Sequence, residues 1–211
     1  MKRIVIIWIG LAFVYAGFIA WHQPLRGPLT ETEVRTAFGD FFDTLDQNEV
    51  AGAEVFLDFF LSDDGAPFYM VNLDALPSRT PQVEAAEREY GSFMIPRLLS
   101  RASYPVLSTD VIMGLSNSLG GDVAPFDRVV VVRYRSRRDF MHVVATSTFR
   151  DQLQYKVASL DGWYSAPSTM SPMINPPLLL LILLLVIGVA RTRKALKPAQ
   201  RSLQFSQSGG S

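Results

Sequence analysis

Residues that could carry chemistry are few in this sequence, and they do not form a catalytic pattern. The 211-residue chain has no cysteine, and its two histidines, His22 and His142, lie far apart. Thiol nucleophiles and cysteine-bound metals are therefore excluded, and a metal site is not expected. No serine lies in a G-x-S-x-G context, and no P-loop or G-x-G-x-x-G motif is present. We expect no cofactor and lean against catalysis, although the residues leave that question open.

Five side chains remain as candidates for a ligand pocket: Asn72, Tyr69, Tyr90, Arg133 and His142. Asn72 lies inside the apolar stretch FYMVNL, where a buried amide must find hydrogen-bond partners, so a pocket role and a structural role are both open. His142 could carry a proton, but it lies one position off an apolar helical stripe, which favours partial exposure. The tyrosines fit core packing at least as well as a pocket.

The segment RVVVVRYRSRRDF, residues 128–140, holds five arginines in a chain whose formal net charge is zero. Ser136 and Asp139 form the pattern of a capping box, which predicts that a helix begins there. Four consecutive valines before it predict a strand that is apolar on both faces, and hence buried on both sides.

The arginines Arg135, Arg137 and Arg138 are candidate docking residues. Arg137 and Arg138 fall in the first helical turn, where the helix dipole disfavours cations, so they need acidic partners. The acid-rich segment between Glu31 and Asp64 can supply them, from the same chain or from a neighbour. We therefore predict docking onto acid and no binding of phosphate.

An acidic helical extension is predicted over residues 28–62. Ten acidic residues and one basic residue lie between Pro28 and Asp64. Thr30 with Glu33 predicts a capped helix, and a phenylalanine-rich second helix follows it. The neighbouring acids Asp63 and Asp64 precede a glycine, which indicates a turn and not a catalytic carboxylate pair.

Charge and hydropathy together predict two membrane spans. An uncharged apolar run covers residues 4–21 and predicts an anchor over 1–22, and a second apolar run predicts a span over 173–190. A cleavable signal peptide is the alternative for the first run, but its small-residue cleavage site is missing.

All 20 acidic residues lie in the middle section, whereas both ends are basic. The positive-inside rule then places both termini in the cytoplasm of a bacterial inner membrane, with the middle section outside. Residues 191–211 are expected to form a basic, then disordered, cytoplasmic tail.

The middle of the chain, residues 63–168, is predicted to be an α+β domain. Its apolar patterns alternate as β-α-β-β-α-β, which is the ferredoxin-like arrangement with two helices on one face of a four-stranded sheet. Because helices cover one face, burial of both faces of the valine strand requires a second sheet. The most economical source is another copy of the same domain.

Three phrases in this domain resemble a known family. DDGAPFYMVNL (63–73), EYGSFMIPRLL (89–99) and FDRVVVVRYRSRRDFMHVV (126–144) are similar to the DUF1330-type branch of the dimeric α/β-barrel superfamily. The resemblance implies a ferredoxin-like fold whose sheets face each other in a dimer. It carries over no catalytic motif, although the wider superfamily includes cofactor-free monooxygenases and haem-handling proteins.

The expected function is therefore association. We expect a membrane-anchored, non-catalytic interaction or accessory protein that works in the lipid bilayer as a homodimer or as a subunit of a larger membrane complex. The alternative is a small-molecule-binding protein or enzyme, monooxygenase-like or haem-handling, that uses the barrel cavity. Nucleic acid is not expected as a partner, since the middle section carries 13 basic and 20 acidic residues.

Overall fold

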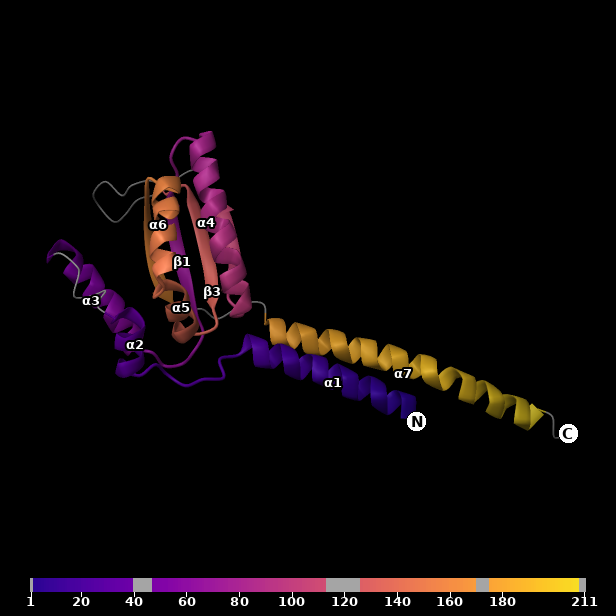
Figure 1. Ribbon diagram of the computed structural model, residues 1–211. Coiled ribbons are helices and arrows are strands. Elements are labelled where there is room, and N and C mark those ends of the chain that lie inside the picture. Colours follow the sequence, from indigo (N-terminus) through magenta and orange to yellow (C-terminus); the bar gives the residue numbers. More distant parts are fainter. Residues whose placement is uncertain (1, 40–46, 113–125, 170–174, 209–211) are drawn as a thin grey trace, which may run out of the picture. The chain divides into compact units, whose positions relative to one another are not determined.

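The computed structural model in Figure 1 describes residues 2–39, 47–112, 126–169 and 175–208. The chain divides into two compact units: residues 1–22 with 171–211, and residues 23–170. The first is a helix pair. The second is a mixed α+β unit with a four-stranded antiparallel sheet, which confirms the predicted class.

The first unit contains α1 (Lys2–His22) and α7 (Pro176–Ser208). Among the described residues, α1 is the one helix whose length and composition suit a membrane span, and a signal sequence near the N-terminus has the same properties. The predicted second span over 173–190 falls largely within α7 and stays a prediction. The tail over residues 191–211 was predicted to be basic and then disordered, but the helix continues to Ser208. Its Ala, Leu, Gln, Lys and Arg residues are good helix formers, which explains this correction.

The two helices of this unit pack closely side by side (Figure 1). Gly188 leaves the space that the Trp8 ring fills, because a Cβ atom at Gly188 would lie 2.5 Å from that ring. One turn further along α7, Thr192 Oγ1 accepts a hydrogen bond of 3.2 Å from the Trp8 indole. A small residue facing a large one is a common way for apolar helices to approach each other.

The sheet of the second unit has the strand order β2-β3-β1-β4, and every pair is antiparallel. The helices α4, α5 and α6 lie on one face of it (Figure 1). The elements run in the predicted order β-α-β-β-α-β, with the second helix in two parts. Their bounds are β1 Phe68–Ala75, α4 Pro81–Ser100, β2 Tyr104–Asp110, β3 Arg128–Tyr134, α5 Arg137–Val144, α6 Ser147–Ser159 and β4 Gly162–Ser168.

Local capping explains where these helices begin. Ser136 caps α5 by accepting a hydrogen bond from the backbone N–H of Asp139, as predicted from the pattern. The single long helix predicted after it is instead broken at Ala145. Thr146 then caps α6 by accepting from the N–H of Phe149 at 3.1 Å, so a second helix begins there.

The acidic extension forms two helices, α2 (Glu31–Phe38) and α3 (Gln47–Leu61). The predicted capping box of Thr30 and Glu33 is confirmed. Phenylalanines of α3 join the core of the α/β unit: Phe60 is fully buried and stacks on Phe140 of α5 at 5.8 Å between ring centroids. The extension is therefore part of the same core and not a separate spacer.

We predict that Phe60→Ala destabilises the second unit by about 3–5 kcal/mol, because it leaves a cavity within a cluster of aromatic rings. Urea unfolding of the detergent-solubilised chain, followed by near-ultraviolet circular dichroism, measures this change. Leu61→Ala on the same helix is the matched control. Leu61 is 37% exposed, and the substitution should change stability by less than about 1 kcal/mol. Equal effects of the two substitutions would contradict this placement of α3.

Candidate functional site

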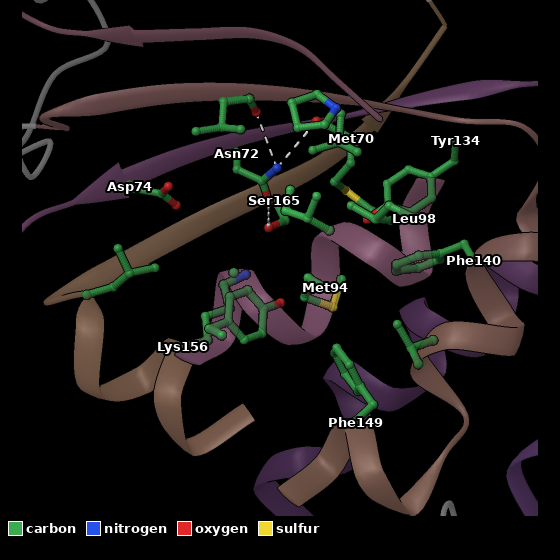
Figure 2. A pocket seen from close by; sticks show the side chains of 18 of the residues that line it. Met70, Asn72, Asp74, Met94, Leu98, Tyr134, Phe140, Phe149, Lys156 and Ser165 are labelled. Carbon is green, nitrogen blue, oxygen red and sulfur yellow. Dashed lines mark hydrogen bonds between the residues drawn. The ribbon is translucent and has the colours of Figure 1, made fainter. Parts of the chain in front are cut away.

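A cavity of about 590 Å³ lies between the helices and the sheet of the second unit. All four strands supply its floor with side chains, and these come from alternate positions because successive residues of a strand point to opposite faces. Helices α4, α5 and α6 supply the opposite wall, and α3 contributes Val55, Phe56 and Phe59. Figure 2 shows ten of the lining side chains by name.

One part of the cavity is apolar. Tyr134 of β3 and Phe140 of α5 lie there, with ring centroids 4.8 Å apart. Figure 2 places Leu98, Phe140 and Phe149 on this side, away from Asp74 and Lys156. Burial raises the pKa of the Tyr134 phenol, so this hydroxyl stays protonated. This part offers ring faces and aliphatic groups to a ligand, and no charge.

The middle of the floor carries Asn72, whose amide is already engaged. Its Nδ2 donates to the backbone oxygens of Val130 at 3.2 Å and Met70 at 3.4 Å, and its Oδ1 accepts from Ser165 Oγ at 2.7 Å (Figure 2). Asn72 thus links the central strand to β3 and to β4. The sequence left a structural role and a pocket role open for Asn72, and these contacts describe the structural role.

The polar end of the cavity combines Asp74 of β1 with Lys156 of α6. Asp74 is 9% exposed, and its Oδ1 is buried with no hydrogen-bond partner among the described residues. Burial raises the pKa of this carboxyl, and burial lowers the pKa of the Lys156 ammonium. Lys156 Nζ lies 4.8 Å from the centre of the Trp163 ring. Within the described chain, these opposite charges form no direct ion pair.

Tyr90 of α4 completes this end of the cavity. Burial, with a smaller contribution from the charge of Asp74, raises the pKa of its phenol to about 12. Next to it, Glu87 and Arg128 neutralise each other: Arg128 Nη1 lies 2.7 Å from Glu87 Oε1, and Arg128 Nε lies 3.1 Å from Asp110 Oδ1. Asp74 therefore differs from Glu87, which has cationic partners in contact.

Of the five side chains predicted for a pocket, Asn72 and Tyr90 line this cavity. Tyr69 and Arg133 are buried on the opposite face of the sheet, where Arg133 Nη1 donates to the oxygen of Ala102 at 2.9 Å. The prediction that these two share one pocket with Asn72 is wrong, because one-residue steps along β1 and β3 reverse the direction of a side chain.

His142 lies in a second hollow of about 570 Å³, so it too is separate from Asn72. Burial, and then the charge of Arg101, lowers the pKa of its imidazole. This hollow is otherwise lined mostly by polar residues, among them Arg26, Arg135 and Arg138. Asp139 also lines it, but its carboxylate already accepts hydrogen bonds from Arg135 and Ser136.

Sequence reasoning missed Asp74 and Lys156. Asp74 follows Asn72 by two positions in the same strand, so strand periodicity alone places both on one face. That signal was present in the sequence. Lys156 had no comparable signal, because it reaches the cavity only through the packing of α6 on the sheet.

The candidate docking arginines contact the acidic extension of their own chain. Arg138 pairs with Glu33 through both carboxylate oxygens and donates to the oxygen of Pro28 at 3.0 Å. Arg137 Nη1 donates to the oxygen of Phe59 at 2.7 Å, and its guanidinium lies 4.7 Å from the Phe59 ring. These contacts hold α2 and α3 against α5.

The third docking candidate, Arg135, has a local partner. Its Nε and Nη2 each donate to Asp139 at 2.7 Å, four residues further along the chain. Asp139 also accepts from the Ser136 hydroxyl at 2.8 Å, so Arg135 is part of the helix cap.

Comparisons with known proteins show limited similarity. No family model matches the chain, and no curated protein matches it. A protein of unknown function from Rhodopseudomonas palustris is similar in structure, with 21% identity and a TM-score of 0.47 over 56% of this chain and 94% of that chain. The methylated form of that protein gives 20% identity and a TM-score of 0.48, over 57% of this chain and 93% of that chain.

We predict that Arg138→Gln loosens the extension and weakens the acid dependence of stability. Hydrogen bonds from Arg138, and then from Thr30, lower the pKa of Glu33 from 4.5 to about 2. Because the folded state holds the ionised form more tightly, this contribution is present above pH 4.5 and is lost as the pH falls toward 2. Urea midpoints measured from pH 6 to pH 3 should therefore fall less steeply in the variant.

The matched control is Arg35→Gln on α2. Arg35 pairs with Glu31 at 2.8 Å, but both side chains are more than 60% exposed. An exposed pair of this kind contributes no more than about 0.5 kcal/mol. If both variants gave the same pH profile as the parent chain, the proposed clamp on Glu33 would be wrong.

Proposed function

We propose that this protein is a membrane-anchored, non-catalytic interaction protein whose α/β domain associates through the sheet face that its helices leave uncovered. The observation that supports this is the composition of that face. Helices α4, α5 and α6 lie on the other side of the sheet, and no described helix of residues 23–169 packs on this one (Figure 1).

The strand register shows that the middle of this face is apolar, next to a row that holds Tyr69 and Arg133. Two neighbouring rows cross all four strands: Leu107, Val131, Val71 and Ala166 form one row, and Thr109, Val129, Leu73 and Tyr164 form the other. Seven of these eight side chains are hydrophobic or aromatic. Two adjacent, mostly apolar rows of this kind are suited to packing on another sheet.

A second copy of the domain is the partner that this surface suits best. The strand order and the β-α-β-β-α-β sequence of elements fit a ferredoxin-like domain. The phrases quoted above make the DUF1330-type branch of the dimeric α/β barrels the family that we propose. Two sheets packed face to face would bury both rows and complete the burial of Val129, whereas Val131 is already buried within one chain.

We further propose that both α1 and α7 span a bacterial inner membrane. The apolar first half of α7, residues 176–190, packs against α1, and basic residues follow it directly. Basic residues also begin α1. This pattern supports cytoplasmic termini and a periplasmic α/β domain.

The cavity supports a second candidate function, the binding of a small molecule. Its volume of about 590 Å³ lies within the range of roughly 300–1,000 Å³ that is usual for ligand sites. It is mostly apolar with a few polar groups at one end, as such sites are. No described group in it forms a nucleophile with an adjacent base, so binding is better supported than catalysis.

For the association, we predict that Leu107→Glu and Tyr164→Glu convert the detergent-solubilised dimer to a monomer. Leu107 is 49% exposed and Tyr164 is 59% exposed in a single chain, so neither change should impair folding. In the dimer, each glutamate would be buried without a partner. Light scattering coupled to size-exclusion chromatography measures the mass.

The matched control for this test is Val157→Glu on α6. Val157 is 52% exposed and lies on the helical side of the unit, so the same kind of charge should leave the dimer intact. A parent chain that is monomeric at all concentrations would contradict the proposal, as would dimers that survive both substitutions on the sheet face.

The absence of cysteine permits a clean test of topology. We predict that Gln82→Cys in α4 reacts with a membrane-impermeant maleimide in intact cells, whereas Ser202→Cys reacts only after the membrane is permeabilised. The parent chain, which has no thiol, is the control for background labelling. Labelling of Ser202→Cys in intact cells would exclude the two-span arrangement.

A further inference from the structure

We propose that the polar end of the cavity binds the hydroxyl group of a neutral, otherwise apolar small molecule such as a phenol, which donates a hydrogen bond to Asp74 and accepts one from Lys156. This inference rests on the small-molecule-binding function proposed above and names its ligand class. Three observations lead to it: an unused acceptor, two separated opposite charges, and an apolar cavity beyond them.

The unused acceptor is Asp74 Oδ1. This atom is buried, and no donor from the described residues reaches it. Buried polar atoms in folded proteins nearly always have a partner, since leaving one without a hydrogen bond destabilises the fold. An acceptor that faces a cavity is satisfied when a ligand brings the missing donor. Figure 2 shows the Asp74 carboxylate on the cavity side of β1.

The charges select a neutral ligand. Asp74 and Lys156 influence each other electrostatically across this end of the cavity but do not form an ion pair. A buried carboxylate ligand would face Asp74, and a buried ammonium ligand would face Lys156, so each would be opposed by one residue. A hydroxyl group is uncharged and is both a donor and an acceptor, so it can satisfy both residues at once.

The remaining polar groups do not compete for this role. Glu87 and Arg128 pair with each other, and Arg79 also contacts Glu87 at 3.1 Å. The amide of Asn72 is engaged with the neighbouring strands. Asp74 and Lys156 are therefore the charged lining residues that form no side-chain hydrogen bond or ion pair with the described residues, although Lys156 also lies over the Trp163 ring.

The body of the ligand must be apolar. Beyond Asp74 and Lys156 the lining consists mainly of methionine, leucine, valine and aromatic side chains, including Met94, Tyr134 and Phe149. Aromatic rings pack favourably against such ring faces and edges. A phenol with a short alkyl chain matches this cavity, because its hydroxyl fits the polar end and its ring and chain fit the apolar part.

Four probes of similar shape test the ligand class: 4-propylphenol, propylbenzene, 4-propylbenzoate and 4-propylbenzylamine. The full chain in lipid nanodiscs is titrated with each probe at pH 7 by isothermal calorimetry, and empty nanodiscs correct for partitioning into lipid. We expect the phenol to bind at least about tenfold more tightly than the other three, since a hydrogen bond to a charged group is worth about this much.

Two variants identify the residues. Asp74→Leu and Lys156→Met should each weaken the binding of 4-propylphenol by about tenfold and leave the binding of propylbenzene unchanged. Asp74→Leu should also raise the thermal midpoint by about 2–4 °C, because it removes a buried charge without a partner. The control is Asp161→Leu, which changes an exposed acid outside the cavity and should leave both probes unaffected.

The results separate this inference from the function on which it rests. If propylbenzene or an ionic probe bound as tightly as the phenol, the ligand class would be wrong, while binding in the cavity would stand. If none of the probes bound, both proposals would be overturned. A lower thermal midpoint in Asp74→Leu, together with equal loss of phenol and propylbenzene, would show that Asp74 only supports the fold.

Discussion

The central position of β1 determines most of what this domain can do. This strand pairs with β3 on one side and with β4 on the other, so its alternate side chains form the middle of both faces of the sheet. One set, which includes Asn72 and Asp74, faces the helices and the cavity. The other set, which includes Val71 and Leu73, faces the side that no described helix covers. One strand therefore serves an internal site and an external surface, and the two-residue period keeps them apart.

The acidic extension becomes part of the domain through the arginines at the start of α5. Arg138 binds Glu33 and the chain before α2, whereas Arg137 binds the end of α3. Asp63 completes this connection, since its Oδ2 accepts from the N–H of Leu29 at 2.8 Å. These contacts bring the α3 phenylalanines to the apolar part of the cavity. The arginine cluster thus acts within the chain, where it completes the wall of a site.

Much of the local structure was predictable from the sequence. The capping residues Thr30 and Ser136 mark helix starts because a cap depends only on residues three positions apart. The order of strands and helices followed from the change in apolar period along the chain. The break at Ala145 and the helical tail after residue 191 were not predicted. After Ala145 the Thr146 cap starts a new helix, and in the tail good helix formers continue α7.

The sequence by itself determined the class of the domain, its helix starts, its apolar N-terminal helix and the absence of thiol chemistry, because these depend on composition and on short-range spacing. The tertiary structure alone decided the site. It separated Tyr69, Arg133 and His142 from Asn72, and it brought Lys156 to the same end of the cavity as Asp74, a residue 82 positions earlier. Contacts over such separations follow from how helices pack on a sheet, and no local pattern in the chain encodes which side chains then meet.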